Sequence, residues 1–369
     1  MITVVSPSVR RAGRALVTGI GGFTGRHLVA HLTELGYEVW GTAAPGTANT
    51  EDVASATFAT AEVDLLDEER LEAWIADARP EVVAHLAAAS HVTQGTPANT
   101  YLTNIVGTRN LLSALTALDT KPRAVLLASS ANIYGNAPFE VLDENITPQP
   151  ANDYAISKLA MEYAARLWMD RLPICIARPF NYTGVGQRED FLLPKVVGHH
   201  ARRAPTISLG NLHVSRDFSD VRDVVAIYAK LLEAAPAGEI FNVCSGVGHS
   251  LGEVLAMLRE IADYKIEVFV DPRFLRANEI HRLVGSNIKL RRTIGRVPST
   301  PLRRTLEWMY EHAERAQPPA DAGSIEQTAP VFELSDQLPS EESAASPSVV
   351  TVPAHAANSS SSCEDKLDM

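Results

Sequence analysis

Short apolar runs alternate with longer amphipathic segments along most of the chain. The runs lie at 15–18, 38–42, 82–86, 124–128 and 174–177, and helical patterns lie at 26–35, 104–118 and 154–170. Apolar strands separated by helices are typical of a doubly wound parallel sheet that is buried on both faces. After residue 178 the pattern loosens into shorter elements. The pattern therefore predicts an α/β fold, in which ligands lie at the carboxyl ends of the strands.

A glycine-rich turn follows the first predicted strand. Gly19, Gly22 and Gly25 are spaced three apart between this strand and the first amphipathic helix, and a second strand follows the helix. These lengths match a βαβ unit. Glycines at this spacing allow a tight turn, a close approach to a pyrophosphate and close packing of the helix on the sheet. Alone they could form an ordinary turn, but this context predicts dinucleotide binding.

A tyrosine and a lysine form the candidate catalytic pair. Tyr154 and Lys158 are four residues apart and share one helical face. An ammonium group beside a phenol lowers the pKa of the phenol, which can then exchange a proton with a hydroxyl or carbonyl group. Ser130, just after the strand at 124–128, could hold the same oxygen. A tyrosine and a lysine at this spacing usually mean only an amphipathic helical surface. The glycine turn, which would bind a hydride carrier, favours the catalytic interpretation here. Because Gly19, Ser90 and Ser130 all follow strand ends, we expect them to face one crevice.

Composition limits the other classes of function. With 369 residues, of which 46% are hydrophobic, the chain can bury a sizeable core in one or two domains. It has no run of about 18 apolar residues that could cross a membrane and no apolar run after residues 1–14 that would indicate a secretory signal. Cys175, Cys244 and Cys363 are odd in number and far apart, so neither a disulfide framework nor a metal site is predicted. We expect a cytoplasmic protein.

The negative charge is concentrated at the C-terminal end. Residues 316–369 carry −8 of the net charge of −11, together with six prolines and a run of four serines at 359–362. This composition predicts a disordered, solvated tail, with a docking role for 331–334 as the alternative. No dense basic block is present, which argues against nucleic-acid binding.

The motifs, in this order, resemble the extended short-chain dehydrogenase/reductase family, also called the NAD-dependent epimerase/dehydratase family. The resemblance covers residues 14–310 and rests on the glycine turn, 64–65, 85–88, 104–108, the set Ser130, Tyr154 and Lys158, and 178–181. It implies a Rossmann-type domain over 1–180 with returning segments near 217–245. A smaller α/β substrate-binding domain over 181–315 and the tail at 316–369 would follow.

Within this family, the chain is most similar to the subgroup of GDP-4-keto-6-deoxy-D-mannose reductases and GDP-mannose 4,6-dehydratases. The similar segments are 178–187, 210–223, 242–246 and 271–279. The resemblance implies a nucleotide-sugar substrate. It places these residues at the substrate: Ser90, Asn132, Asn181, Arg216, Arg276 and Glu279. Arginines suit diphosphate oxygens and a glutamate suits ribose hydroxyls. The alternative for Arg216 is a surface ion pair with Asp217.

The resemblance also implies a nicotinamide cofactor. In addition to Tyr154 and Lys158, the residues that would contact it are Gly19, Gly22, Phe23, Thr24, Gly25, Thr42, Asp64, Leu65, Leu86, Ala87, Ala88, Asn104 and Pro179. Asp64 would lie at the adenine edge, and its alternative role is to cap the following helix. The segment 41–45 has neither the acid that favours NAD nor the arginine that favours NADP, so NADPH and NADH both stay open.

Two positions after Ser130 bear on the reaction. In 4,6-dehydratases of the family these positions carry a glutamate, often preceded by an aspartate, whereas this chain has Ala131 and Asn132. Asparagine is neither an acid nor a base at ordinary pH. We therefore expect NAD(P)H-dependent reduction of the C4 keto group of a GDP-linked 4-keto-6-deoxyhexose, giving a deoxysugar such as rhamnose.

Other functions are weighed against the reductase. An NAD-dependent nucleotide-sugar C4 epimerase is the first alternative, and a 4,6-dehydratase is less favoured. A catalytically silent binding protein is disfavoured by Ser130, Tyr154 and Lys158.

The resemblance further implies a homodimer. In this family, two helices from each subunit commonly pair, and here these helices are 104–118 and 154–170. Met161, Ala165 and Trp168 are candidate interface residues, with a place in the core of one chain as the alternative.

Overall fold

The computed structural model describes residues 12–46, 56–89, 96–274 and 280–316. The chain divides into two compact units, Met1–Pro318 and Pro319–Met369, and the described residues all lie in the first. Three of the predicted substrate-binding residues, Ser90, Arg276 and Glu279, lie outside the described residues, as does the predicted tail beyond residue 316.

A sheet of seven parallel strands forms the centre of the first unit. The strands, in sheet order, are β10 (Ile240–Val243), β6 (Ile174–Pro179), β5 (Ala124–Ala128), β4 (Val82–His85), β1 (Arg14–Thr18), β2 (Glu38–Ala43) and β3 (Ala59–Glu62). The order reverses between β1 and β4, and a crevice for ligands forms at such a switch point. The predicted strands are all present, with ends that differ by at most two residues.

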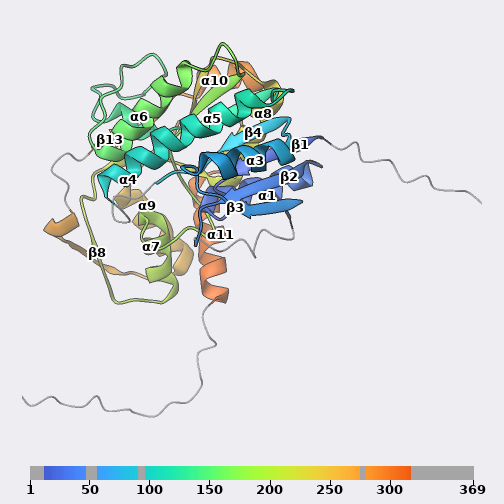
Figure 1. Cartoon of the computed structure of the whole chain (residues 1–369). Helices are drawn as coiled ribbons and strands as arrows, with labels where there is room; N and C mark the ends of the chain where they lie inside the picture. The colour runs from blue at the N-terminus through green and yellow to red at the C-terminus, as the bar shows by residue number, and fades with distance from the viewer. Residues whose placement is uncertain (1–11, 47–55, 90–95, 275–279, 317–369) are drawn as a thin grey trace, which may run out of the picture. The chain divides into compact units, whose positions relative to one another are not determined.

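Both faces of this sheet are buried. Side chains alternate between the two faces along each strand, so the strands contribute to both cores. In β5, Ala124 and Leu126 pack in one core, and Val125 and Leu127 pack in the other. Figure 1 shows α3, α5 and α6 side by side along one face. Helices α1 and α8 pack together on the other. This is the doubly wound arrangement that the sequence pattern predicts.

The helices differ from the predicted ranges mainly at their ends. The predicted helix at 104–118 starts at residue 97 and contains a π-helical turn, η1. The helical segments of this part of the chain are α1 (Phe23–Glu34), α3 (Glu68–Ala78), α4 (Pro97–Tyr101), η1 (Leu102–Gly107), α5 (Thr108–Ala117), the 3-10 turn η2 (Ala131–Tyr134), α6 (Asp153–Arg166) and α8 (Val221–Ala234).

The remaining described elements form two smaller sheets and a separate core. In one sheet β9 pairs with β7, β11 and β13, and in the other β8 pairs with β12. Helices α7, α9 and α11 build the core beside them. The bounds are β7 (Asn181–Thr183), α7 (Leu192–Ala201), β8 (Thr206–Leu209), β9 (Ser215–Asp220), β11 (Gly248–Ser250), α9 (Leu251–Ala262), β12 (Glu267–Val270), the 3-10 turn η3 (Pro272–Phe274), β13 (Arg282–Leu283), α10 (Ile288–Ile294) and α11 (Leu302–Arg315). The division at residue 180 stays a prediction.

The outward face of α6 is not the one expected from the sequence. Met161 and Ala165 are buried in the core beneath the sheet, and Trp168 packs against the same core. These three residues therefore belong to the core of one chain, which was the alternative to a dimer interface. The exposed apolar residues of this helix are Ile156 and Tyr163, and Leu167 follows at its C-terminal cap.

Candidate active site

The glycine turn after β1 is held in place by its neighbours. Gly19 has a φ of +75°, and a Cβ atom there would lie 2.9 Å from the backbone of Ala87. A Cβ on Gly25 would lie 2.2 Å from the carbonyl oxygen of Gly19. The carbonyl of Thr42 accepts hydrogen bonds from the amides of Gly19 (2.8 Å) and Ile20 (3.1 Å). The turn thus needs glycine at both positions, and Thr42 braces it from β2.

Helix α1 starts directly after this turn. Its N-cap, Gly22, provides no side-chain hydrogen bond, and the first turn has no acidic residue. Amide groups at such a helix start attract anionic oxygens. Phe23 stacks on Tyr182 with ring centroids 6.0 Å apart, and the hydroxyls of Thr24 and Tyr182 share a hydrogen bond of 2.7 Å. The start of α1 therefore fits a dinucleotide pyrophosphate, and Tyr182 of β7 contacts two of the predicted residues, Phe23 and Thr24.

The segment after β4 is tied to β1. The amide of Leu86 donates to the carbonyl of Thr18 (3.3 Å), and the amide of Ala87 donates to the Thr18 hydroxyl (3.2 Å). His85 lies between Thr18 Oγ1 (2.7 Å) and Thr108 Oγ1 (2.9 Å). Burial lowers the pKa of His85 to about 3. This imidazole is therefore neutral at ordinary pH and connects β1, through Thr18, to α5, through Thr108.

Asp64 lies exposed between β3 and α3. One carboxylate oxygen accepts a hydrogen bond from the Leu66 amide (2.9 Å). The cap of α3 is Asp67, which accepts from the Arg70 amide. The alternative of Asp64 as the helix cap is therefore wrong. Leu65 beside it is buried.

Asn104 lies within the π-helical turn and joins three parts of the site. Its side-chain oxygen accepts from the Ala89 amide (2.9 Å), and its Nδ2 donates to the Ser157 hydroxyl (2.9 Å). Ser157 in turn donates to the carbonyl of Tyr154 (2.8 Å). A π-helical turn inside an α-helix is frequent at functional sites. Here it carries the residue that ties the strand end after Ala88 to the catalytic helix.

Ser130 and Tyr154 meet at the carboxyl end of β5. Ser130 is the extended residue that caps η2, and its Oγ accepts from the amide of Asn132 (3.2 Å). The hydroxyl of Ser130 lies beside that of Tyr154 and lowers its pKa. Asn152 caps α6, so Tyr154 lies in the first helical turn. The three candidate catalytic residues come from two adjacent elements.

The protonation of these groups follows from burial. Burial raises the pKa of Tyr154, Tyr182 raises it further, and the hydrogen bond with Ser130 lowers it. The expected lowering of this pKa is therefore wrong, since removal from water outweighs the other effects. The Nζ of Lys158 donates to the carbonyl of Ala128 (2.7 Å), and burial lowers the pKa of Lys158 to about 8. Tyr154 is protonated at neutral pH, as a proton donor must be.

A buried polar network, which was not predicted from the sequence, lies behind this pair. Glu162 accepts two hydrogen bonds from Arg178 and one from Ser129. Arg178 also donates to the hydroxyl of Tyr134 (2.9 Å), which donates to Asn242 (2.7 Å). The available signal was the spacing, because Glu162 follows Lys158 by the same four residues that separate Lys158 from Tyr154.

The predicted substrate-binding residues that the structure describes lie on several elements. Asn132 is half-buried in η2, and Asn181 is exposed at the start of β7. Pro179, a cofactor candidate, is buried at the end of β6, where it pairs with Val243.

Arg216 and Asp217 have separate partners. A guanidinium nitrogen of Arg216 donates to the carbonyl of Ser215 (3.0 Å). Asp217 is fully buried and accepts hydrogen bonds from Ser245 and from the amide of Gly246. The alternative of a surface ion pair between them is therefore wrong. Asp217 holds a loop, and Arg216 lies partly exposed in β9.

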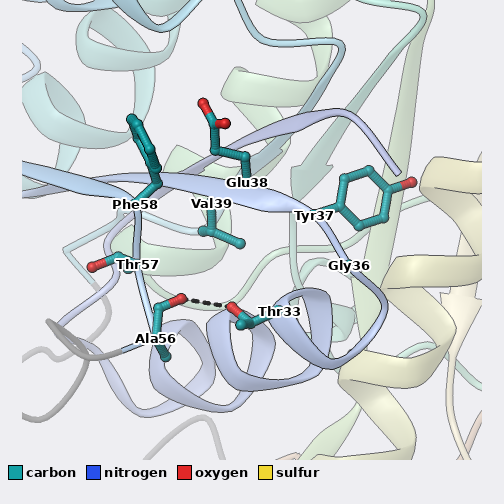
Figure 2. A pocket seen from close by; sticks show the side chains of 8 residues that line it. All are labelled: Thr33, Gly36, Tyr37, Glu38, Val39, Ala56, Thr57 and Phe58. Carbon is teal, nitrogen blue, oxygen red and sulfur yellow. Dashed lines mark hydrogen bonds between the residues drawn. The ribbon is translucent and has the colours of Figure 1, made fainter. Parts of the chain in front are cut away.

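A small hollow lies away from these residues. Figure 2 shows its lining, which includes Thr33 at the end of α1 and the segment Gly36 to Val39 leading into β2. The hydroxyl of Thr33 donates to the carbonyl of Ala56 across it (2.6 Å). The glycine turn follows the carboxyl end of β1, whereas this hollow lies at the amino end of β2. It is therefore not part of the candidate active site.

Comparison with known proteins agrees with this arrangement. The family model of GDP-mannose 4,6 dehydratase matches residues 16–309. The chain belongs to this family. Within the described residues of this family member, every helix is too short or too polar to cross a lipid bilayer.

Two curated relatives of this family member are named as enzymes that act on GDP-linked 6-deoxyhexoses. The chain is 33% identical over 301 residues to GDP-6-deoxy-D-talose 4-dehydrogenase of Aggregatibacter actinomycetemcomitans, covering 81% of this chain and 97% of that protein. It is 34% identical over 309 residues to GDP-6-deoxy-D-mannose reductase of Pseudomonas aeruginosa, covering 79% and 94%.

Solved structures are similar over the same part of the family member. One is a candidate epimerase from Burkholderia cenocepacia J2315, 62% identical with a TM-score of 0.79, covering 83% of this chain and 100% of that one. Another is RMD from Pseudomonas aeruginosa complexed with NADPH, 32% identical with a TM-score of 0.71, covering 82% and 99%.

Proposed function

We propose that the chain is a nucleotide-sugar oxidoreductase that reduces the C4 keto group of a GDP-linked 4-keto-6-deoxyhexose with NADPH or NADH. The placement of the Ser130 hydroxyl beside that of Tyr154 carries the proposal. The two residues after Ser130, Ala131 and Asn132, lack the acids that a dehydratase uses. The names of the two curated relatives support C4 chemistry on a GDP-6-deoxyhexose.

Each catalytic residue has one task in this proposal. A bound nicotinamide supplies the hydride for the carbonyl carbon of the sugar. Tyr154 donates its proton to the oxygen at C4, and Ser130 holds that oxygen by a hydrogen bond. Lys158 stabilises the phenolate that Tyr154 becomes. Ala131 is buried and apolar, so it provides no second acid or base for the neighbouring carbon.

The cofactor and substrate contacts are also proposals. The glycine turn and the start of α1 would hold the pyrophosphate, and Asp64 would lie near the adenine. Asn132, Asn181 and Arg216 would face the sugar and its diphosphate. 6-Deoxytalose and 6-deoxymannose differ in configuration at C4, so analysis of the product by NMR would show from which side the hydride arrives.

Cofactor stoichiometry tests the reaction class. We expect purified enzyme, supplied with a GDP-4-keto-6-deoxyhexose, to oxidise one NADPH or NADH for each sugar reduced, as measured by absorbance at 340 nm and product chromatography. The C4 epimerase, suggested by the candidate epimerase from Burkholderia cenocepacia, would interconvert two GDP-hexoses with no net change in absorbance. Parallel runs with NADPH and NADH give the preference that the segment 41–45 leaves open.

We also propose a homodimer formed through α6 and η1. Ile156, Tyr163 and Leu167 are 42%, 55% and 67% exposed, and their spacing places them along one side of α6. Leu102 and Val106 are exposed on η1, which packs beside α6. An apolar stripe over two adjacent helices suits a self-complementary interface with a second copy.

Substitution at this stripe tests the dimer. We expect Leu167→Glu to convert the protein to monomers in light scattering after size exclusion, because a buried unpaired carboxylate opposes association. Leu35→Glu is the matched control, since Leu35 is a 49% exposed leucine at the end of α1. A Leu167→Glu protein that elutes with the same mass as the parent would contradict this interface.

The proposed location is the cytoplasm. Cys175 and Cys244 are free thiols buried in the described part of the chain, which suits a reducing compartment.

A further inference from the structure

Three ionisable side chains follow one another on the inner face of α6. Tyr154, Lys158 and Glu162 are spaced four residues apart, so each lies one turn above the last. Lys158 is 4% exposed and Glu162 is 1% exposed. Buried charges require partners. The partners of these two groups connect Glu162 with the catalytic centre.

The end of β5 meets this helical face residue by residue. The carbonyl of Ala128 accepts from Lys158 Nζ (2.7 Å), and the hydroxyl of Ser129 donates to Glu162 (2.5 Å). The next residue, Ser130, lies beside the hydroxyl of Tyr154 and lowers its pKa. Three consecutive residues at the end of one strand thus lie against the three side chains.

The carboxylate of Glu162 is fixed more firmly than the other two groups. Arg178 approaches it side-on, with Nε at 2.9 Å and Nη2 at 2.7 Å, in the bidentate geometry of strong pairs. Tyr134 accepts from the same guanidinium (2.9 Å). The carboxylate of Glu162 is therefore fixed by three donated hydrogen bonds, one helical turn from Lys158.

We propose that Glu162 is a positioning residue of the catalytic centre, whose fixed carboxylate keeps Lys158 in the ammonium form that stabilises the Tyr154 phenolate. This inference rests on the proposed function of Tyr154 and Lys158. It assigns to the pair of Glu162 and Arg178 a role in the reaction, in addition to its role in the core.

The charges around Lys158 agree with this role. On α6 it faces Tyr154, which is protonated, and Glu162. On β4 it faces His85, which is neutral, and Arg178 on β6 is paired with Glu162. Burial lowers the pKa of Lys158 to about 8, and Glu162 opposes this effect. Without the carboxylate, burial would act unopposed.

The first test is a titration of Lys158 in the protein without cofactor or substrate. The chain has seven lysines, so ¹³Cε-lysine labelling gives few signals, and Lys158→Met assigns the relevant one. We expect Glu162→Gln to lower the pKa of Lys158 by about one unit or more. Glu253→Gln, which removes an exposed carboxylate in α9, is the control and should leave it unchanged. An unmoved Lys158 in Glu162→Gln would overturn the proposal.

The second test is the pH dependence of kcat. Because the ammonium form is the active one, kcat should fall as pH rises through the pKa of Lys158. In Glu162→Gln this fall should move to lower pH by the same interval. A uniform decrease in kcat at all pH values, with no displacement of the profile, would indicate a purely structural role and overturn the proposal.

A double variant separates the effect from folding. Glu162→Gln leaves Arg178 buried without a counter-ion, which destabilises a core. Glu162→Gln with Arg178→Met removes both charges and keeps an acceptor for Ser129. We expect this protein to fold and to retain the lowered pKa of Lys158. A return of that pKa to the parent value would overturn the proposal. Because the titration needs no turnover, failure of the reductase assay alone would count against the proposed function and not against this result.

Discussion

Tyr154→Phe is expected to lower kcat for the reduction of a GDP-4-keto-6-deoxyhexose by about 10²–10⁴-fold, the usual contribution of a positioned general acid. Tyr154 is the phenol that Ser130 contacts, and its raised pKa keeps the proton on it until the oxygen at C4 accepts it. Phenylalanine keeps the packing of the partly buried ring. Affinity for the nucleotide sugar should therefore stay within a few-fold in calorimetry, while steady-state kinetics show the loss.

A second buried tyrosine offers the matched control. The hydroxyl of Tyr228 in α8 has no hydrogen-bond partner among the described residues. Tyr228→Phe also removes a phenolic hydroxyl and should leave kcat within about two-fold, since no hydrogen bond is lost. Full activity in Tyr154→Phe would contradict the role of Tyr154, and an equal loss in both variants would point to a general disturbance of the core.

The strands of the central sheet could be predicted from the sequence because their residues are apolar without interruption, which indicates burial on both faces. Runs such as 124–128 are apolar at successive positions, and only a strand covered on both faces needs this pattern. The glycine turn could be predicted for a similar reason. At Gly19 and Gly25 the space for a Cβ atom is absent, and the spacing of the glycines reflects that contact.

The network of Glu162 could not be predicted in this way. Its partners Ser129 and Arg178 lie on β5 and β6, and they meet Glu162 only once α6 packs across these strands. The direction of the pKa of Tyr154 was missed because spacing indicates which charges are near, whereas burial, the larger effect here, depends on the packed surroundings. The outward face of α6 was missed for the same reason. Spacing identifies the sides of a helix, but the position of the sheet decides which side is covered.

Gly25→Ala is expected to weaken binding of NADPH by about 5- to 150-fold, the range that corresponds to an overpacking cost of about 1–3 kcal/mol. The new methyl group would lie 2.2 Å from the carbonyl oxygen of Gly19 and 2.8 Å from the Cα of Ile20, which are both backbone atoms. The backbone would have to move, and the turn that cradles the pyrophosphate would open. Fluorescence titration with NADPH measures the loss.

Gly252→Ala controls for the same substitution near the start of another helix. There the nearest atom to a Cβ is the hydroxyl oxygen of Ser250 at 3.9 Å, an ordinary van der Waals distance, and the residue lies in α9. NADPH affinity should be unchanged in this variant. If Gly25→Ala keeps both its circular dichroism spectrum and its affinity for NADPH, the dinucleotide does not bind over the start of α1. The catalytic pair would then have to take its hydride from a cofactor held elsewhere along the strand ends, and the role of Thr42 in bracing the turn would be structural only.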